Sequence, residues 1–198
     1  IGLTSSDVVD TSFALLLRSA GEQIKRGLLE CIAALFRKAN EAKGVLCLGR
    51  THGQAAEPTT FGLKLLSHAA EFARSYKRIS SAIDEIGVGK FSGAIGVYGH
   101  TDPEIEKTAL HYLGLIPEII STQIVPRDRH AQFFADLAIL AGSIERFCIN
   151  LRLLMHDGVE EAYEPFYEGQ KGSSAMPHKK NPVQSENLCG LARLMRSY

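Results

Sequence analysis

Apolar residues recur at every third or fourth position over three long segments, residues 12–40, 58–86 and 127–156. This spacing predicts three amphipathic helices, and Pro58 suits the first turn of the second helix because its missing N–H costs little there. Each segment is about 30 residues long, so each helix would extend about 45 Å. One small domain cannot cover an apolar strip of that length. The pattern therefore predicts an all-α fold, an elongated bundle in which long helices pack against others in this chain or in copies of it.

The segments between these helices are rich in glycine and proline. Residues 87–101 hold five glycines, which are too many for a helix interior. A shorter helix is predicted over residues 103–113, with Asp102 as its N-cap. Residues 158–183 are predicted to form a long loop, of the kind that is usually functional when it interrupts a compact domain. A last helix follows this loop to the end of the chain.

The charge and composition of the chain exclude several classes of partner. Among 198 residues, 22 Lys and Arg balance 22 Asp and Glu, and nucleic-acid binding is disfavoured because neutralising phosphates takes a surplus of positive charge. No apolar run approaches the roughly 20 residues that span a bilayer, and no charged-then-apolar leader opens the chain. Neither a membrane nor secretion is therefore expected. The four cysteines form no CxxC pair, which favours reduced thiols and a cytoplasmic location.

Two short motifs partly match a phosphate-binding loop and a metal site, but each lacks a feature that such a site requires. Residues 44–51 differ from a phosphate-binding loop by Arg50 in place of Lys, but the segment before them has a helical pattern, so the strand–loop–helix context is missing. His156 and Asp157 have no second His or Cys at ligand spacing, and a histidine at the C-terminal end of a helix is favoured by the helix dipole. Neither motif predicts a nucleotide loop or a metal site.

Two other segments carry side chains suited to chemistry. His52 lies in GRTHGQAAEPTTFG, residues 49–62, on a loop just before a helix, where it could transfer protons or could hold the loop by hydrogen bonds. Residues 171–186, KGSSAMPHKKNPVQSE, place serine, lysine and asparagine on a loop framed by glycine and proline. Such a loop is either an anion-binding site or an exposed basic loop, and its composition alone favours the second.

The order of residues in this loop resembles a known family. GSSAMPHKKNP, residues 172–182, closely resembles the signature loop S-S-x-M-P-x-K-x-N of the fumarase/aspartase superfamily. The segment at 49–62 and TSSDVVDT at 4–11 are similar to the same superfamily, and the second is similar to the adenylosuccinate lyase family within it. RDRH at 127–130 and SENLCGLARLMRSY at 185–198 resemble that family as well. The resemblance covers nearly the whole chain.

The resemblance implies an architecture. Residues 1–198 would form the family's central domain of long helices, with its N-terminal and C-terminal domains absent. The chain starts at Ile1 rather than Met, which agrees with a piece of a longer protein. In the family's homotetramer four such domains pack into one bundle, and each active site draws on three subunits.

The resemblance also implies a reaction, with a small nucleotide substrate and no metal or organic cofactor. The family releases fumarate by β-elimination from adenylosuccinate, giving AMP, and from SAICAR, giving AICAR, in purine biosynthesis. This chemistry needs a base for the proton beside a carboxylate, an acid for the leaving nitrogen, and positive charge for the aci-carboxylate intermediate. By resemblance, Ser173 is the base and His52 is the general acid. The other implied residues are Lys179 and Asn181 at the substrate carboxylates, Glu186 as a supporting carboxylate, and Thr4, Ser5, Thr51 and Gln123 as substrate contacts.

Two alternatives remain open. A sister lyase of the superfamily, acting on argininosuccinate, aspartate or malate, is disfavoured by the segments at 4–11 and 127–130. A non-catalytic helical scaffold is the second alternative, since the superfamily has members recruited as structural proteins. The presence of Ser173, His52 and Lys179 argues against a scaffold.

Overall fold

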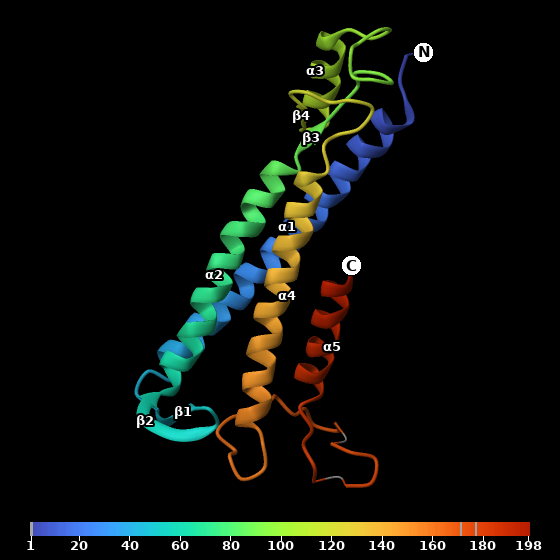
Figure 1. Ribbon diagram of the computed structural model, residues 1–198. Helices are drawn as coiled ribbons and strands as arrows, with labels where there is room; N and C mark the ends of the chain where they lie inside the picture. Colours follow the sequence, from blue (N-terminus) through green and yellow to red (C-terminus); the bar gives the residue numbers. More distant parts are fainter. Residues whose placement is uncertain (1, 171, 177) are drawn as a thin grey trace. The chain divides into compact units, whose positions relative to one another are not determined.

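The computed structural model describes residues 2–170, 172–176 and 178–198, and these residues are mainly helical (Figure 1). Lys171 and Pro177 of the signature segment lie outside the described residues. The elements are α1 Ser5–Glu41, β1 Leu46–Thr51, β2 Gln54–Thr60, α2 Phe61–Glu85, β3 Val88–Gly89, α3 Pro103–Tyr112, β4 Ile116–Pro117, α4 Asp128–Leu154 and α5 Val183–Ser197.

The chain divides into two compact units, each with its own packing. Unit 1 comprises Ile1–Cys31 and Ala73–Asp136, and unit 2 comprises Ile32–Phe72 and Leu137–Tyr198. The boundaries fall inside α1, α2 and α4, so each of these long helices contributes one part to each unit.

In unit 1, the short helix α3 packs on the early turns of α1. Ala14, Leu110 and Leu115 form a buried cluster, and Leu15 and Phe91 pack against it. Beside this cluster β3 pairs in parallel with β4. This pairing joins the segment that follows α2 to the segment that follows α3.

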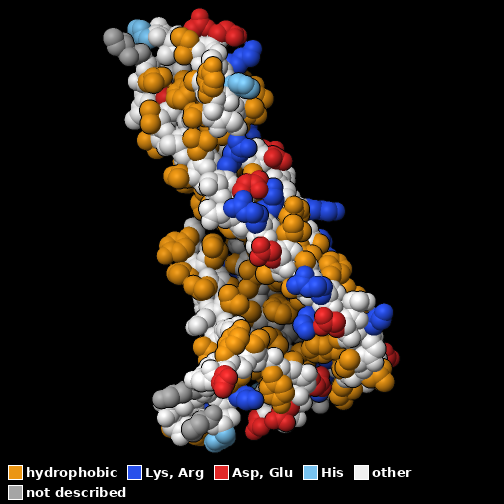
Figure 2. Space-filling model, turned by 180° about the vertical axis from the view of Figure 1, so that it is seen from behind, with side chains coloured by type: hydrophobic (Ala, Val, Ile, Leu, Met, Phe, Trp, Pro, Cys, Tyr) orange, Lys and Arg blue, Asp and Glu red, His pale blue; other side chains and the backbone are white. Residues whose placement is uncertain are grey.

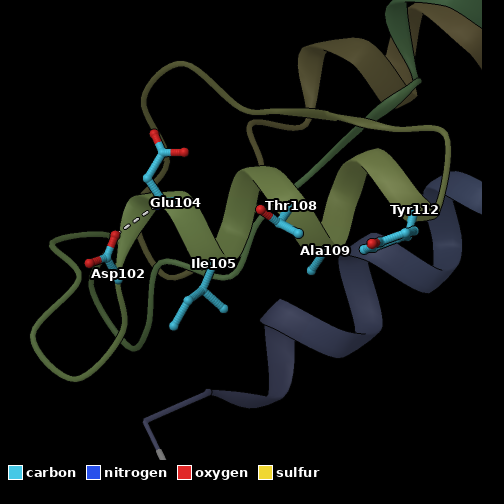
Figure 3. Close-up of a pocket in the computed structure, with 6 residues that line it drawn as sticks. All are labelled: Asp102, Glu104, Ile105, Thr108, Ala109 and Tyr112. Carbon is cyan, nitrogen blue, oxygen red and sulfur yellow. Dashed lines mark hydrogen bonds between the residues drawn. The ribbon is translucent and has the colours of Figure 1, made fainter.

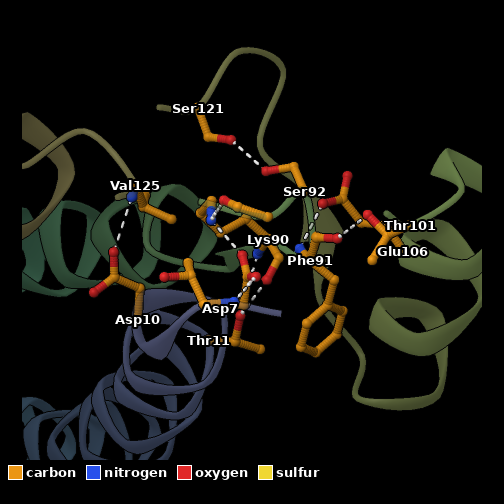
Figure 4. Close-up of polar contacts among 12 residues, drawn as sticks. Asp7, Asp10, Thr11, Lys90, Phe91, Ser92, Thr101, Glu106, Ser121 and Val125 are labelled. Carbon is orange, nitrogen blue, oxygen red and sulfur yellow. Dashed lines mark hydrogen bonds and ion pairs between the residues drawn. The ribbon is translucent and has the colours of Figure 1, made fainter. Parts of the chain in front are cut away.

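A polar network surrounds the first turns of α1 (Figure 4). The Asp7 carboxylate forms an ion pair with the Lys90 ammonium, and both side chains are almost completely buried. One turn later, Asp10 accepts hydrogen bonds from the Val125 amide and the Arg127 guanidinium, both at 2.9 Å. These carboxylates bind two segments that lie far along the chain to the beginning of α1.

Another buried carboxylate, Glu106 on α3, organises the glycine-rich segment at 87–101. It accepts hydrogen bonds from the Phe91 amide at 2.6 Å and from the Tyr98 hydroxyl at 2.7 Å. The hydrogen bond to Glu106 raises the pKa of Tyr98 to about 12, so the phenol stays protonated. The segment is irregular, as its glycines predict, but these bonds fix its path.

Unit 2 contains the last part of α1, the first part of α2, the later part of α4, and α5. Phe147 on α4 contacts Phe72 and His68 of α2 edge-on, with ring centroids 6.3 and 5.1 Å apart. α5 lies beside α4 (Figure 1), where Arg193 and Arg196 both pair with Glu145. The buried apolar residues are Ile32, Leu35, Ala39, Ala69, Phe72, Leu137, Leu140, Ala141, Cys148, Cys189 and Ala192.

Most of the predicted helices are confirmed. α2, α4 and the C-terminal α5 lie within a few residues of their predicted ranges. Asp102 is the N-cap of α3, since its Oδ1 accepts from the Glu104 amide at 2.8 Å and Pro103 follows in the first turn (Figure 3). The fold is mainly helical as predicted, with two small two-stranded sheets in addition.

α1 begins at Ser5, well before its predicted start at residue 12. The Thr4 amide donates to Asp7 Oδ2 at 2.8 Å, and the Asp7 amide donates to the Thr4 carbonyl at 3.1 Å. Thr4-x-x-Asp7 therefore acts as part of a capping box at the helix start. Apolar periodicity missed these turns because their buried positions hold Asp7, Asp10 and Thr11 instead of apolar residues.

A β-hairpin occupies residues 46–60, where a loop leading into a helix from Pro58 was predicted. β1 and β2 are antiparallel, with Leu46 opposite Thr60 and Thr51 opposite Gln54. Pro58 lies in β2 opposite Leu48, so the prediction that Pro58 opens a helix is wrong. A β-carbon on Gly49 would lie 2.6 Å from the Glu57 carbonyl oxygen, so glycine permits this close approach of the strands.

Large apolar side chains remain exposed on the helices of both units (Figure 2). In unit 1 they include Val8, Val9 and Leu16, and in unit 2 they include Leu63, Leu153 and Leu191. No helix in the described ranges is both long enough and apolar enough to cross a membrane.

Candidate active site

His52 lies at the tip of the β1–β2 hairpin in unit 2. Thr51 pairs with Gln54, so the loop between the strands has only two residues, His52 and Gly53. Both have positive φ, 53° and 75°, as a type I′ turn requires. Asparagine or glycine usually occupies the first of these positions, and a histidine is tolerated there at some cost in backbone energy. The sequence therefore places an imidazole at an exposed tip although other residues suit the turn better.

The His52 ring makes no hydrogen bond to any of the described residues. Its side chain is exposed, as is that of its neighbour Thr51. The hairpin is held instead by its strand pairing and by the turn conformation. The interpretation that His52 stabilises its own loop by hydrogen bonds finds no support, and the ring remains available to a ligand.

The hairpin is attached to the segment that follows α4 through Glu161. The Arg50 guanidinium lies 2.7 Å from Glu161 Oε1, and the Lys64 ammonium lies 3.5 Å from Oε2. Lys64 also donates to the Leu48 carbonyl at 2.8 Å. The hydrogen bond from Arg50, assisted by Lys64, lowers the pKa of Glu161, so this carboxylate is ionised at neutral pH.

The signature loop crosses itself at Gly172. A β-carbon on Gly172 would lie 1.8 Å from the Lys179 carbonyl oxygen, so no other residue fits at this crossing. The Asn181 amide donates to the Gly172 carbonyl at 3.2 Å, and the Lys179 amide donates to the Met176 carbonyl at 3.0 Å. These contacts fold the loop so that Ser173 is half-buried while the Lys179 side chain is exposed.

The base of this loop is closed by Glu164. One carboxylate oxygen accepts from the Ser185 amide at 2.8 Å and from the Ser185 hydroxyl, and the other accepts from the Gln184 amide at 3.1 Å. The N-cap residue of α5, Pro182, has no capping side chain. Glu164 therefore supplies the cap from a distant position, and its negative charge suits the positive end of the helix dipole.

Glu186, the predicted supporting carboxylate, lies in the first turn of α5 and is exposed. The Arg152 guanidinium of α4 lies 3.8 Å from its Oε1. Behind it, Cys189 contacts Cys148, and burial raises the pKa of Cys148 to about 11. Because the thiolate is the reactive form, this cysteine is a packing residue and not a nucleophile.

The remaining predicted substrate contacts belong to unit 1. Thr4 is half-buried, and Ser5 is exposed at the start of α1. Gln123 is exposed in the segment between β4 and α4, where the Thr122 amide donates to the Ile124 carbonyl at 3.3 Å. Thr51, His52, Ser173, Lys179, Asn181 and Glu186 all belong to unit 2.

One segment that sequence reasoning overlooked contacts both the His52 hairpin, through Glu161, and the start of α5 after the signature loop, through Glu164. Glu161 and Glu164 were not predicted to matter, although two carboxylates three residues apart in a loop after a long helix are a visible feature. Their partners Arg50 and Ser185 lie 111 and 21 positions away along the chain, outside the range of any local sequence pattern. Only long-range contacts identify their role.

A shallow surface pocket of 560 Å³ lies elsewhere, along α3 of unit 1 (Figure 3). None of the predicted site residues lines it; the lining residues are Asp102, Glu104, Ile105, Thr108, Ala109 and Tyr112. Within the described ranges, no group of three or more His, Cys, Asp or Glu side chains is arranged to hold a metal ion.

Comparison with known proteins identifies relatives that are similar to this chain along its whole length. The chain is 52% identical over 197 residues to the adenylosuccinate lyase of Thermotoga maritima and 48% identical over 197 residues to that of Bacillus subtilis. Each match includes 100% of this chain and 46% of the relative. The chain therefore spans about half the length of the curated relatives it matches.

Solved structures share the fold. A 3-carboxy-cis,cis-muconate lactonizing enzyme from Pseudomonas putida superposes with a TM-score of 0.89 at 32% identity, covering 100% of this chain and 44% of that one. A fumarate lyase from Mesorhizobium sp. BNC1 gives 0.86 at 28% identity, covering 99% and 43%.

The family model described as "Lyase" matches residues 1–195, which include the hairpin, the signature loop and the capped start of α1. This match and the relatives agree with the resemblance seen in the sequence. The chain belongs to this lyase family.

Proposed function

We propose that this chain is the central part of an adenylosuccinate lyase, which releases fumarate from adenylosuccinate to give AMP and from SAICAR to give AICAR. The observation that carries the proposal is the 52% identity with the Thermotoga maritima adenylosuccinate lyase along the whole chain. The muconate lactonizing enzyme and the fumarate lyase share only 32% and 28%. The substrate is therefore assigned from the more similar relatives.

In this reaction Ser173 takes the proton from the carbon beside the substrate carboxylate. A serine hydroxyl is a weak base, so its alkoxide must be stabilised by its surroundings. The signature loop supports this role, because it places Ser173 half-buried and six residues before the exposed Lys179, and an ammonium close to the hydroxyl would favour its ionised form.

His52 donates the proton to the leaving nitrogen as the C–N bond breaks. Its exposed place at a rigid hairpin tip supports this role, because a general acid must reach the substrate without rearranging. The electrons of the broken C–H bond form the new C=C bond of fumarate, and the leaving nitrogen keeps the electrons of the C–N bond.

Positive charge and hydrogen-bond donors would hold the two carboxylates of the succinyl group. Lys179 is exposed on the signature loop, and Asn181 lies near the point where the loop closes. Glu186 supports this part of the site from α5. Thr4, Ser5, Thr51 and Gln123 complete the proposed contacts with the substrate.

We also propose that the protein is a homotetramer whose active sites are shared between subunits. The exposed apolar residues on both units, such as Leu16 and Leu63, support association with other helices. In unit 2, His52 and Ser173 are not hydrogen-bonded to each other, which agrees with sites that combine residues from different chains.

The test is fumarate release by the full-length protein, followed by absorbance. Adenylosuccinate and SAICAR are expected to be cleaved, and argininosuccinate, aspartate and malate are expected to be left intact. Turnover of one of these three instead would indicate a sister lyase. A folded protein without turnover on any of the five would indicate a helical scaffold.

A further inference from the structure

Two carboxylates on one short segment of unit 2, Glu161 and Glu164, make more contacts than surface acids usually do. Their partners include an arginine, a lysine, two backbone amides and a hydroxyl. The segment is anchored to the end of α4, because the Glu161 amide donates to the Leu154 carbonyl at 2.9 Å. The backbone of this segment is therefore held against the end of α4, and this fixes the positions of both carboxylates.

Glu161 faces the hairpin. The side chains of Glu161, Arg50 and Lys64 are only 22%, 30% and 26% exposed, so this three-residue cluster is better shielded than a typical surface ion pair. Arg50 lies one residue before Thr51 and two before His52. The ion pair therefore constrains the strand from which the imidazole projects.

Glu164 contacts the start of α5. Its three hydrogen bonds join residues that are 20 and 21 positions apart, so they close the loop that carries Ser173. Closing a loop of this length fixes both of its ends and reduces the conformations open to the residues between them. The same bonds fix the first turn of α5, which carries Glu186.

We propose that Glu161 and Glu164 are positioning residues for the lyase reaction: Glu161 holds the hairpin that carries His52, and Glu164 holds the loop that carries Ser173. This inference rests on the proposed function. Neither carboxylate needs to touch the substrate. Each acts through the geometry of another residue, and a misplacement of about 1 Å in such a site can cost about 10²-fold in rate.

The decisive variant is Glu164→Gln in the full-length protein. The amide keeps one acceptor oxygen but loses the charge and the second acceptor, so one end of the loop base is released. Glu168→Gln is the matched control, because Glu168 lies on the same loop and is exposed. Glu161→Gln is compared in the same way with Glu160→Gln, whose side chain is also exposed.

We expect Glu164→Gln to lower kcat about 10- to 100-fold with KM changed by less than about threefold, since the base acts in the transition state. Glu161→Gln should lower kcat less, because Arg50 keeps its place in the strand. Both controls should stay within about twofold of the wild type. Ser185→Ala, which removes one of the three donors to Glu164, should give a smaller loss and serves if Glu164→Gln fails to fold.

A second readout does not depend on activity. Hydrogen exchange at the amides of Gln184 and Ser185 should accelerate in Glu164→Gln and not in Glu168→Gln. Equal kcat in Glu164→Gln and Glu168→Gln, or a higher KM at unchanged kcat, would overturn the inference. A wild type without turnover on adenylosuccinate would refute the proposed function instead, and the exchange rates would still test the contacts of Glu164.

Discussion

The polar residues at the start of α1 in unit 1 and those of the hairpin and loop in unit 2 behave in opposite ways. Asp7 and Asp10 are buried, and their carboxylates accept hydrogen bonds from other residues of the chain. His52 and Lys179 are exposed, and no described side chain binds them. Both sets lie in segments that resemble the same superfamily, so resemblance alone does not distinguish them.

The difference separates structural polar groups from available ones. A buried carboxylate whose two oxygens are both hydrogen-bonded within the chain is not accessible to a substrate. The exposed imidazole of His52 lies on a strained turn, which lowers the stability of the fold, and no hydrogen bond to a described residue compensates for this loss. Such strain is typical of functional positions. Within the segment at 4–11, the buried Asp7, Asp10 and Thr11 build the fold, whereas Thr4 and Ser5 remain accessible to a ligand.

The largest effect is expected at the serine of the signature loop. Ser173→Ala in the full-length protein should lower kcat about 10²- to 10⁴-fold with little change in substrate affinity, because a general base acts in the transition state. Steady-state fumarate release gives both values. Ser174→Ala is the neighbouring control, and a variant at 173 that keeps more than about a tenth of kcat would remove Ser173 from the role of base.

His52→Gln should also lose most of its activity, and it tests whether sites are shared. If Ser173 and His52 of one site come from different chains, mixing the two inactive variants in equal amounts restores about one quarter of the sites after dissociation and reassembly. Activity of the remixed sample measures this fraction. Mixtures that stay inactive would place both residues on one chain or contradict their roles.

Asp7→Asn tests the structural side of the comparison. It leaves the Lys90 ammonium buried without its counter-charge, and breaking a buried pair in this way costs about 3–5 kcal/mol of folding free energy. Denaturant unfolding measures the loss. Glu104→Gln, which removes a charge from the exposed pair with Lys107, is the control and should change stability by less than about 0.5 kcal/mol. A similar small change in Asp7→Asn would show that the pair contributes little.

His130 makes the stability of unit 1 depend on pH. Its ring stacks on Phe13 at 5.4 Å, and neither ring nitrogen has a hydrogen-bond partner among the described residues. Burial, with Arg127 nearby, lowers its pKa, although the charges of Asp10 and Asp128 act in the opposite direction.

The sign follows from which state binds protons more readily. Below the ordinary value of 6.5, the unfolded chain takes up a proton at this histidine before the folded chain does. The contribution to stability is therefore complete above that pH and is lost as the pH falls below it. Melting temperatures from pH 7.5 to 5 should decrease less steeply in His130→Phe, which keeps the stacking. Parallel curves for both proteins would contradict this assignment.

The smallest effect is expected at the N-cap of α3. Asp102→Ala removes the acceptor for the Glu104 amide and should cost about 1 kcal/mol. Asp102→Asn should keep nearly all of the stability, because asparagine caps as well as aspartate. Thermal unfolding of the two variants distinguishes a capping effect from a charge effect, and equal losses would point to charge.

The sequence by itself determined the features that depend on neighbours along the chain. The three long helices follow from apolar residues three or four positions apart, and the cap of α3 follows from Asp102 before Pro103. The signature loop and His52 were found from the order of residues, without knowledge of what surrounds them.

Only the tertiary structure decided which groups are already occupied. The hairpin at 46–60 was missed because its strands are short and their pairing joins residues that no helical or alternating pattern links. The early turns of α1 were missed because Lys90 and Arg127 make buried carboxylates acceptable there. Glu161 and Glu164 look like ordinary loop acids until their partners are known. The energy of a buried or bridging charge depends on groups brought near by folding, and local sequence does not contain that information.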